Sequence, residues 1–175
     1  MRRTLVLGGA RSGKSAHAEG LLTDAPATYV ATARHDPGDD EWSARIATHR
    51  KRRPDTWRTV ELDDPAGLGP FLAEATGPVL VDDIATWLAS LLDDADAWDG
   101  GDLRPVGQAC NDLGAGLGRS QAEIVLVSAE VGLGVVPATR SGRLFRDQLG
   151  ALNAALADRC TDVLLLVAGI PLRLR

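Results

Sequence analysis

Residues 8–15 read GGARSGKS, which matches the pattern G-x-x-x-x-G-K-[ST], and they follow an apolar run at residues 4–7. Glycines in such a loop allow the backbone N–H groups to wind around a phosphate, and a helix that begins near Lys14 adds the positive end of its dipole. Lys14 is then placed to reach the β- and γ-phosphate oxygens, and the Ser15 hydroxyl to ligate Mg²⁺. A glycine-rich turn that binds nothing would not require these flanks in this order. The stretch therefore predicts a strand, a phosphate-binding loop and a helix.

Short apolar runs alternate with longer segments that carry apolar residues at helical spacing. Several of the runs are apolar almost throughout, which is typical of strands buried on both faces of a parallel sheet. We therefore predict an α/β fold, with a mostly parallel sheet and helices on both of its faces. Strands are expected at residues 4–7, 28–31, 57–62, 79–82, 124–128 and 163–168. Helices are expected at residues 14–22, 41–52, 84–92, 103–119 and 140–158, and loops at residues 67–70, 77–78 and 93–102.

The size and charge of the chain exclude several classes of protein. At 175 residues it is long enough for one domain, residues 1–175, whose core needs neither disulfide nor metal. Its net charge of −5 does not provide the positive field of a nonspecific nucleic-acid binder, so no nucleic-acid partner is expected. No run is apolar for the roughly 20 residues that a membrane span needs, and we expect no signal peptide, because Met1, Arg2 and Arg3 lead straight into a short apolar strand. Cys110 and Cys160 lie in apolar stretches without metal-binding spacing, so we expect buried thiols and a cytoplasmic location.

Two adjacent carboxylates, Asp82 and Asp83, end the apolar run at residues 79–82. A Mg²⁺ ion on a triphosphate usually needs an acidic partner at the end of a strand near the phosphate loop, and Asp82 is our candidate. A carboxylate after an apolar run can also cap the next helix, and Asp83 suits that role better. The sequence thus predicts that Ser15 and Asp82 share the metal.

The helix expected at residues 41–52 places His49 among arginines. Residues three or four positions apart share one helix face, so Arg45, Arg52 and Arg53 lie near the imidazole. Clustered positive charge disfavours the protonated ring and lowers its pKa, which leaves a neutral nitrogen available as a nucleophile. The same guanidinium groups can clamp a polyphosphate. A solvated basic helix with an incidental histidine is the alternative that these residues leave open.

Five blocks of the sequence, in this order, resemble one known family. They read GGARSGKS, ARIATHRKRRPDTWRTVE, VDDIATWLASLL, VSAEVGLGVVP and RLFRDQLGALN followed by LLLVAGIPLRL. They extend over nearly the whole chain and resemble the bifunctional adenosylcobinamide kinase / adenosylcobinamide-phosphate guanylyltransferase family of cobalamin biosynthesis. The resemblance implies a P-loop NTPase with a RecA-like sheet, and a homotrimer.

The resemblance also implies an activity and a set of site residues. Members of that family phosphorylate the aminopropanol hydroxyl of adenosylcobinamide with ATP or GTP. They then transfer GMP from GTP to the new phosphate, giving adenosyl-GDP-cobinamide and pyrophosphate, with Mg²⁺ as cofactor. His49 corresponds to the histidine that becomes guanylylated, and Lys14 is the other catalytic residue expected. The nucleotide contacts implied by the motif and the resemblance are Gly8, Gly9, Ala10, Arg11, Ser12, Gly13, Lys14, Ser15, Ala31, Thr32, Ala33, Arg50, Lys51, Arg52, Arg53, Glu61 and Asp82.

Two departures from the family pattern concern the substrate side of the site. Ala129 stands where the family usually has Asn, and Asp83 where it usually has Cys. A P-loop kinase of another small metabolite, without guanylyl transfer, is the alternative function. A GTPase switch is disfavoured because Asn occurs only at positions 111 and 153 and neither precedes Lys, so the guanine-reading motif Asn-Lys-x-Asp is absent from the sequence.

Overall fold

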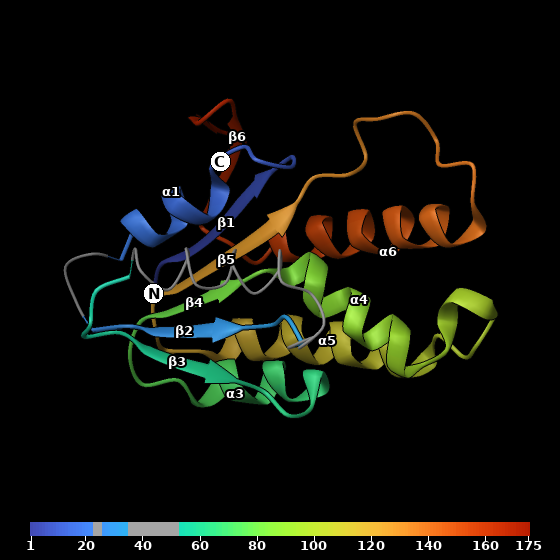
Figure 1. Ribbon diagram of the computed structural model, residues 1–175. Coiled ribbons are helices and arrows are strands. Elements are labelled where there is room, and N and C mark those ends of the chain that lie inside the picture. The colour runs from blue at the N-terminus through green and yellow to red at the C-terminus, as the bar shows by residue number, and fades with distance from the viewer. Residues whose placement is uncertain (23–25, 35–52) are drawn as a thin grey trace.

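The computed structural model describes residues 1–22, 26–34 and 53–175. In this part of the chain, a seven-stranded sheet has the order β3-β2-β4-β5-β1-β6-β7, and only the last pair is antiparallel (Figure 1). Because parallel strands end at the same edge, the residues that follow them gather along one side of the sheet. The strands are β1 (Arg3–Gly8), β2 (Thr28–Ala31), β3 (Arg58–Glu61), β4 (Val79–Asp82), β5 (Ile124–Ala129), β6 (Asp162–Val167) and β7 (Ile170–Arg173).

Helices cover both faces of the sheet, as predicted. Helix α1 (Lys14–Gly20) packs against β1, β4 and β5 on one face. The other four α-helices of the described chain lie together on the opposite face (Figure 1). They are α3 (Leu68–Glu74), α4 (Ile84–Asp94), α5 (Arg104–Arg119) and α6 (Arg140–Ala157). No helix in the described ranges is both long enough and apolar enough to cross a membrane.

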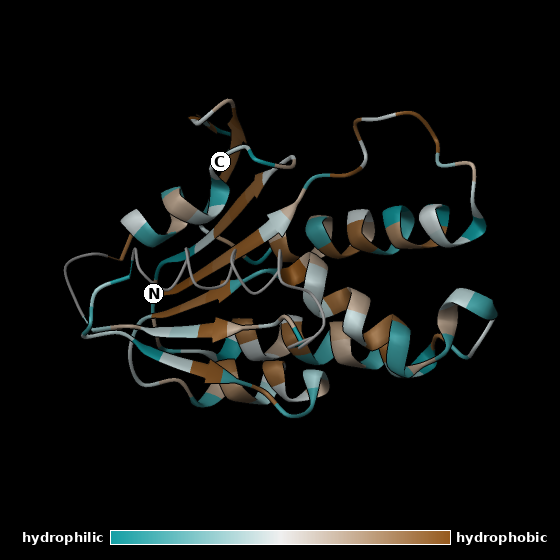
Figure 2. Cartoon of the chain, viewed as in Figure 1, coloured by the Kyte–Doolittle hydropathy of each residue, from teal (hydrophilic) through white to brown (hydrophobic). Residues whose placement is uncertain are grey.

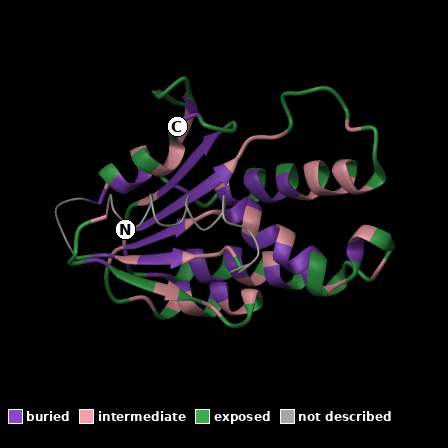
Figure 3. Cartoon of the chain, in the orientation of Figure 1, coloured by how far each residue is buried: buried purple, intermediate pink, exposed green. Residues whose placement is uncertain are grey.

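The apolar core forms two layers, one on each side of the sheet. Along β4, Val79 and Val81 belong to the layer under the four helices, whereas Leu80 between them belongs to the layer under α1. All three are at most 1 % exposed, because successive side chains of a strand point to opposite faces. Figures 2 and 3 show the same pattern along the central strands, which are brown and purple over most of their length. This explains why the strands read as continuous apolar runs.

Polar side chains fix where two of the helices begin. The Asp83 carboxylate accepts a hydrogen bond of 2.7 Å from the Thr86 N–H and so caps α4, which confirms its predicted role. The Thr139 hydroxyl accepts one of 3.1 Å from the Gly142 N–H at the start of α6.

Helices α3 and α5 approach each other more closely than side chains would allow. A Cβ atom on Gly116 of α5 would lie 2.0 Å from the carbonyl oxygen of Gly69 in α3, and one on Gly69 would lie 2.4 Å from the Asp112 carbonyl oxygen. Both distances are well below van der Waals contact. These two glycines are therefore required by the packing of the two backbones.

Some elements differ from the sequence-based prediction. The loop predicted for residues 67–70 is wrong, because α3 begins at Leu68 and carries Pro70 in its first turn. A proline costs little there, since the first N–H groups of a helix have no partner within it. Leu68 and Leu72 are fully buried and hold this short helix against the core. The loop predicted for residues 93–102 is partly helical, since α4 continues to Asp94 and a 3₁₀ turn spans Ala97–Asp99.

Strand β7 is a second element that the prediction omitted. It folds back on β6 through a turn at Ala168 and Gly169, whose φ angles are 52° and 80°. The apolar run that predicts β6 simply continues into β7, and only the glycine marks the reversal. The helix predicted for residues 41–52 lies outside the described residues.

The two thiols behave as hydrophobic groups. Cys160 is buried and Cys110 is half-buried, and both are free. Burial raises the pKa of Cys110 to about 11 and that of Cys160 to about 12, so both are neutral near pH 7. A reactive or metal-binding role is thereby disfavoured.

Candidate active site

The phosphate loop joins β1 to α1 at the carboxyl edge of the sheet. Gly13 has a φ of 88°, a conformation that glycine adopts easily. A Cβ on Gly8 would lie 2.3 Å from the Ser12 Oγ, so the tight loop leaves no room for a side chain there. Lys14, half-buried, reaches back over the loop with its Nζ 3.5 Å from the Gly9 carbonyl oxygen. The loop thus holds a cation above its backbone, as the motif predicts.

The turn between β6 and β7 contacts the phosphate loop through Gly169. The N–H of Gly169 donates a hydrogen bond of 3.0 Å to the Ser12 carbonyl oxygen, and its Cα lies near Gly13, 3.6 Å from where a Cβ would be. The contact joins residues 157 positions apart in the chain, so nothing in the motif itself could have indicated it.

Asp82 connects β4 to the phosphate loop. Its Oδ1 accepts a hydrogen bond of 3.2 Å from the Ser15 hydroxyl, and its Oδ2 accepts one of 3.1 Å from the Tyr29 hydroxyl. Burial, and next the neighbouring charge of Asp83, raise the pKa of Asp82 to about 6, although both hydrogen bonds act to lower it. Burial also raises the pKa of Tyr29, with the Asp82 charge as the next cause. The Tyr29 hydroxyl therefore stays protonated and keeps donating to Asp82.

Arg53 lies over the ring of the same tyrosine. Its guanidinium carbon is 3.6 Å from the centroid of the Tyr29 ring, which is cation–π distance. Its Nη1 also donates a hydrogen bond of 3.1 Å to the Thr59 hydroxyl of β3. Tyr29 thus bridges the last arginine of the predicted clamp and the carboxylate predicted to hold the metal.

The Ser15 and Asp82 oxygens form a set of donors that suits Mg²⁺. Mg²⁺ prefers hard oxygen ligands, and in phosphate sites one or two protein groups commonly suffice because phosphate and water supply the others. The described ranges contain no group of three or more His, Cys, Asp and Glu side chains that could hold a metal without such help. The Ser15 and Asp82 oxygens therefore fit a metal that arrives with a nucleotide, whose phosphate oxygens supply further ligands.

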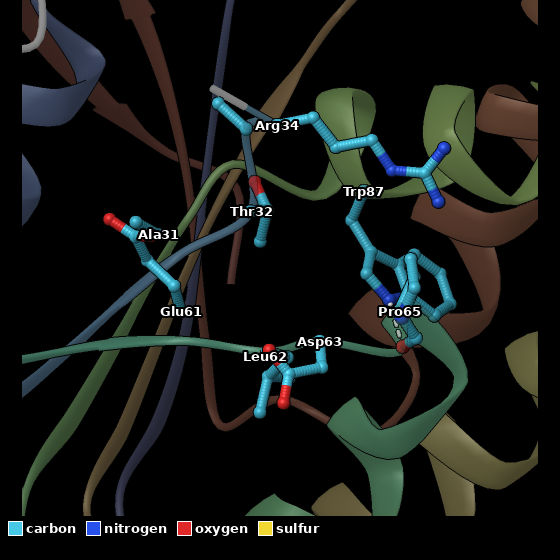
Figure 4. Close-up of a pocket in the computed structure, with 9 residues that line it drawn as sticks. Ala31, Thr32, Arg34, Glu61, Leu62, Asp63, Pro65 and Trp87 are labelled. Carbon is cyan, nitrogen blue, oxygen red and sulfur yellow. Dashed lines mark hydrogen bonds between the residues drawn. The ribbon is translucent and has the colours of Figure 1, made fainter. Parts of the chain in front are cut away.

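A pocket lies along the same edge of the sheet, where β2 and β3 end. Its volume is about 170 Å³ (Figure 4). The Trp87 Nε1 donates to the Pro65 carbonyl oxygen at 2.7 Å, which fixes one wall, and the Thr32 hydroxyl donates to the Asp83 carbonyl oxygen at 2.7 Å near the other. The lining residues are Ala31, Thr32, Ala33, Arg34, Glu61, Leu62, Asp63, Pro65 and Trp87.

The structure brings the described site residues together in two groups. The loop residues Gly8 to Ser15 join Asp82 and, through Tyr29, Arg53. The predicted contacts Ala31, Thr32, Ala33 and Glu61 all line the pocket. Sequence reasoning missed Tyr29, Trp87 and Gly169, because a tyrosine in a strand, a tryptophan in a helix and a glycine in a turn all read as ordinary structure. The remaining predicted residues, His49, Arg50, Lys51 and Arg52, lie outside the described residues.

Comparison with known proteins agrees with this geometry. A family model described as cobinamide kinase / cobinamide phosphate guanyltransferase matches residues 4–174. The bifunctional adenosylcobalamin biosynthesis protein CobP of Pseudomonas aeruginosa is 44 % identical over 180 residues, which cover 99 % of this chain and 97 % of the relative. The bifunctional adenosylcobalamin biosynthesis protein CobU of Escherichia coli is 40 % identical over 188 residues, which cover 98 % of each protein.

A solved structure gives an independent view of the fold. An ATPase from the type III secretion system of pathogenic bacteria superimposes with a TM-score of 0.53 at 12 % identity over 95 % of this chain. The chain spans about half the length of that ATPase, 51 %. This likeness supports the predicted P-loop NTPase fold. The relatives and the family model show more: the chain belongs to the cobinamide kinase / cobinamide phosphate guanyltransferase family.

Proposed function

We propose that this chain catalyses both reactions of its family in the cytoplasm. In the first, the aminopropanol hydroxyl of adenosylcobinamide is phosphorylated with ATP or GTP; in the second, GMP from GTP is transferred to that phosphate, giving adenosyl-GDP-cobinamide and pyrophosphate. One observation carries the proposal: a phosphate loop whose Ser15 is hydrogen-bonded to Asp82, with Arg53 held beside them on Tyr29. This arrangement provides a phosphate cradle, metal ligands and a cation in one place.

The kinase step uses the phosphate-loop end of the site. The N–H groups of the loop and the Lys14 ammonium hold the β- and γ-phosphates, while Ser15 and Asp82 are the residues that would hold Mg²⁺. When bound, Mg²⁺ neutralises charge on the phosphate oxygens. Phosphoryl transfer needs little more from the protein than positioning and charge stabilisation, so this set of residues is sufficient for the nucleotide side.

The guanylyl step needs a nucleophile, and we assign it to His49. A ring nitrogen attacks the α-phosphorus of GTP, an N–P bond forms, and the bond to pyrophosphate breaks. The phosphate oxygen of the corrinoid then attacks the same phosphorus and the histidine leaves. Arg50, Lys51, Arg52 and Arg53 stabilise the phosphate charge in both displacements.

The pocket beside β2 and β3 suits the base of the guanine nucleotide. Guanine carries two neighbouring N–H donors on one edge, and the Glu61 carboxylate in the lining is an acceptor-only group that can receive both. Adenine lacks that pair of donors. This assignment explains why Ala31, Thr32, Ala33 and Glu61, which resemble family nucleotide contacts, converge on one small pocket.

The test is to incubate the protein with Mg²⁺ and GTP labelled at either the α- or the γ-phosphate. Protein-bound label should come only from the α position, and the adduct should be lost in acid and survive alkali, as expected for a P–N bond. His49→Ala should lose the label, whereas His17→Ala, which removes a histidine outside the proposed machinery, should retain it.

Two outcomes would change the assignment. Label that persists in His49→Ala would place the nucleophile elsewhere. A wild-type protein that phosphorylates the corrinoid but takes up no α-label would favour the alternative, a P-loop kinase without guanylyl transfer. The assembly is proposed to be a homotrimer, and a monomer mass in light scattering at micromolar concentration would refute that.

A further inference from the structure

A carboxylate that none of these steps uses lies beside the phosphate loop. In the sheet, β5 lies between β1 and β4, and all three strands run parallel. Glu130 is the first residue after β5. The register pairs Gly8 with Ala129, and the Glu130 N–H donates a hydrogen bond of 3.1 Å to the Gly8 carbonyl oxygen. Glu130 therefore leaves the sheet beside the start of the phosphate loop, between the ends of β1 and β4.

The Glu130 side chain retains the capacity to accept a proton. It is half-buried, and its Oε1 accepts a hydrogen bond of 2.7 Å from the Gly132 N–H. Over residues 1–22, 26–34 and 53–175, we find no other hydrogen bond or ion pair to this carboxylate. An ionised carboxylate offers about four lone-pair sites, so one backbone contact orients the group without filling it.

The end of β5, immediately before Glu130, is fixed by hydrogen bonds with Asn153 of α6. The Asn153 side chain is 5 % exposed and contacts the last two residues of β5. Its Nδ2 donates a hydrogen bond of 3.0 Å to the Ala129 carbonyl oxygen, and its Oδ1 accepts one of 2.7 Å from the Ser128 hydroxyl. A buried amide whose two ends are both bonded fixes the backbone immediately before Glu130.

Three other described carboxylates at the carboxyl ends of the strands already have roles. Asp82 accepts hydrogen bonds on both oxygens, from Ser15 and Tyr29, and Asp83 caps α4. Glu61 lies on β3, at the far end of the sheet from β1. Among described acidic residues that follow the central strands, Glu130 is the one adjacent to the loop and not committed to another role.

The loop that follows Glu130 offers a surface for a large acceptor. The loop between β5 and α6 contains stretches coloured brown, for hydrophobic residues, in Figure 2, and most of it is coloured green, for exposed residues, in Figure 3. Leu133, Val135 and Val136 are 82 %, 95 % and 59 % exposed. An acceptor alcohol with a bulky, partly apolar body can contact these side chains, which follow Glu130 three to six positions along the chain.

We infer that Glu130 is the general base of the kinase step. Its carboxylate takes the proton from the acceptor hydroxyl as the bond from that oxygen to the γ-phosphorus forms. The bond from the γ-phosphorus to the leaving nucleoside diphosphate breaks in the same displacement, and the proton passes from Glu130 to water. This inference rests on the proposed function and adds a residue to its first reaction.

The test compares Glu130→Gln with Glu123→Gln in the phosphorylation of adenosylcobinamide. Glutamine keeps an oxygen that can accept from Gly132 but cannot take a proton. Glu123 precedes the same strand at its opposite end and pairs with Arg2 at 3.8 Å, so its variant is a matched control. Glu130→Gln should lower kcat by about 10²- to 10⁴-fold with little change in KM for ATP, and Glu123→Gln should stay near wild type. Glu130→Asp, which keeps a carboxylate that can take a proton, should restore part of the rate.

The outcomes separate this inference from the proposed function. A wild-type protein that does not phosphorylate adenosylcobinamide contradicts the proposed function itself. If the wild type is active, a Glu130→Gln rate within threefold of it overturns the inference, and so does a Glu130→Asp rate no higher than that of Glu130→Gln. A fall in thermal stability or in ATP affinity together with the rate assigns Glu130 a structural role, which also overturns it.

Discussion

The two faces of the sheet serve different purposes. The face under α3, α4, α5 and α6 buries a large, almost wholly apolar layer, with two helices packed backbone to backbone at Gly69 and Gly116. The face under α1 has a smaller apolar layer, and at its carboxyl edge it carries the polar chain from Ser15 through Asp82 and Tyr29 to Arg53. We expect substitutions on the first face to change stability with little effect on chemistry, and those on the second to do the reverse.

The largest expected effect is on the α1 face. Lys14→Ala removes the cation that holds the β- and γ-phosphates, so adenosylcobinamide phosphorylation should fall by about 10³-fold or more. Alanine is well tolerated in a helix, so the thermal unfolding temperature should stay within about 2 °C of wild type. A steady-state kinase assay beside a thermal melt checks both parts. Activity within tenfold of wild type would contradict the assigned role of Lys14.

The opposite face should show the reverse pattern. A Cβ on Gly116 would meet the Gly69 carbonyl oxygen at 2.0 Å, so Gly116→Ala must separate α3 from α5. We expect a loss of about 2 kcal/mol in the free energy of unfolding, or roughly 4–8 °C in the unfolding temperature. The kinase rate of the folded variant should be nearly unchanged at low temperature.

Gly118→Ala is the matched control, two positions further along α5. Gly118 is exposed and has nothing within 4 Å of its Cβ position, so alanine there should raise stability by up to about 1 kcal/mol. Equal effects of the two substitutions in urea unfolding would show that helix propensity, not the contact between α3 and α5, decides stability here.

The same division explains what the sequence could predict. The phosphate loop, the alternating layers and the helix cap at Asp83 depend on local spacing, and all agree with the structure. Helix α3 is short and contains Gly69 and Pro70, so its local signals argue against a helix, and tertiary burial of Leu68 and Leu72 overrides them. The hydrogen bond between Gly169 and Ser12 joins distant parts of the chain, and no periodic pattern in the sequence indicates it.

Tyr29 is the clearest case of a site residue that the sequence hides. It sits in β2 among apolar neighbours and is 6 % exposed, so composition and periodicity both assign it to the core. Only the folded structure shows that its hydroxyl donates a hydrogen bond to Asp82 and that its ring makes a cation–π contact with Arg53. Its ring belongs to the stabilising layer and its hydroxyl to the site, which makes it the residue where the two roles can be separated.

Tyr29→Phe should therefore give a small and pH-dependent effect. Burial raises the pKa of Asp82 to about 6, and the hydrogen bond from Tyr29 acts to lower it. Loss of the hydroxyl removes that lowering influence, so the pKa rises further and more of Asp82 is protonated at pH 6. Because a metal ligand must be ionised, the apparent affinity for Mg²⁺ should fall about fivefold at pH 6, whereas at pH 8.5 Asp82 is ionised in both proteins and the difference should nearly vanish.

The measurement is Mg²⁺ activation of the kinase reaction at both pH values. Phenylalanine keeps the ring and hence the contact with Arg53, so Tyr29→Leu, which removes both, provides the comparison. It should weaken nucleotide turnover at pH 8.5 as well, because Arg53 loses the surface that holds it. If Tyr29→Phe loses the same activity at pH 6 and pH 8.5, the hydroxyl does not act through the ionisation of Asp82, and the tyrosine serves the site only by packing.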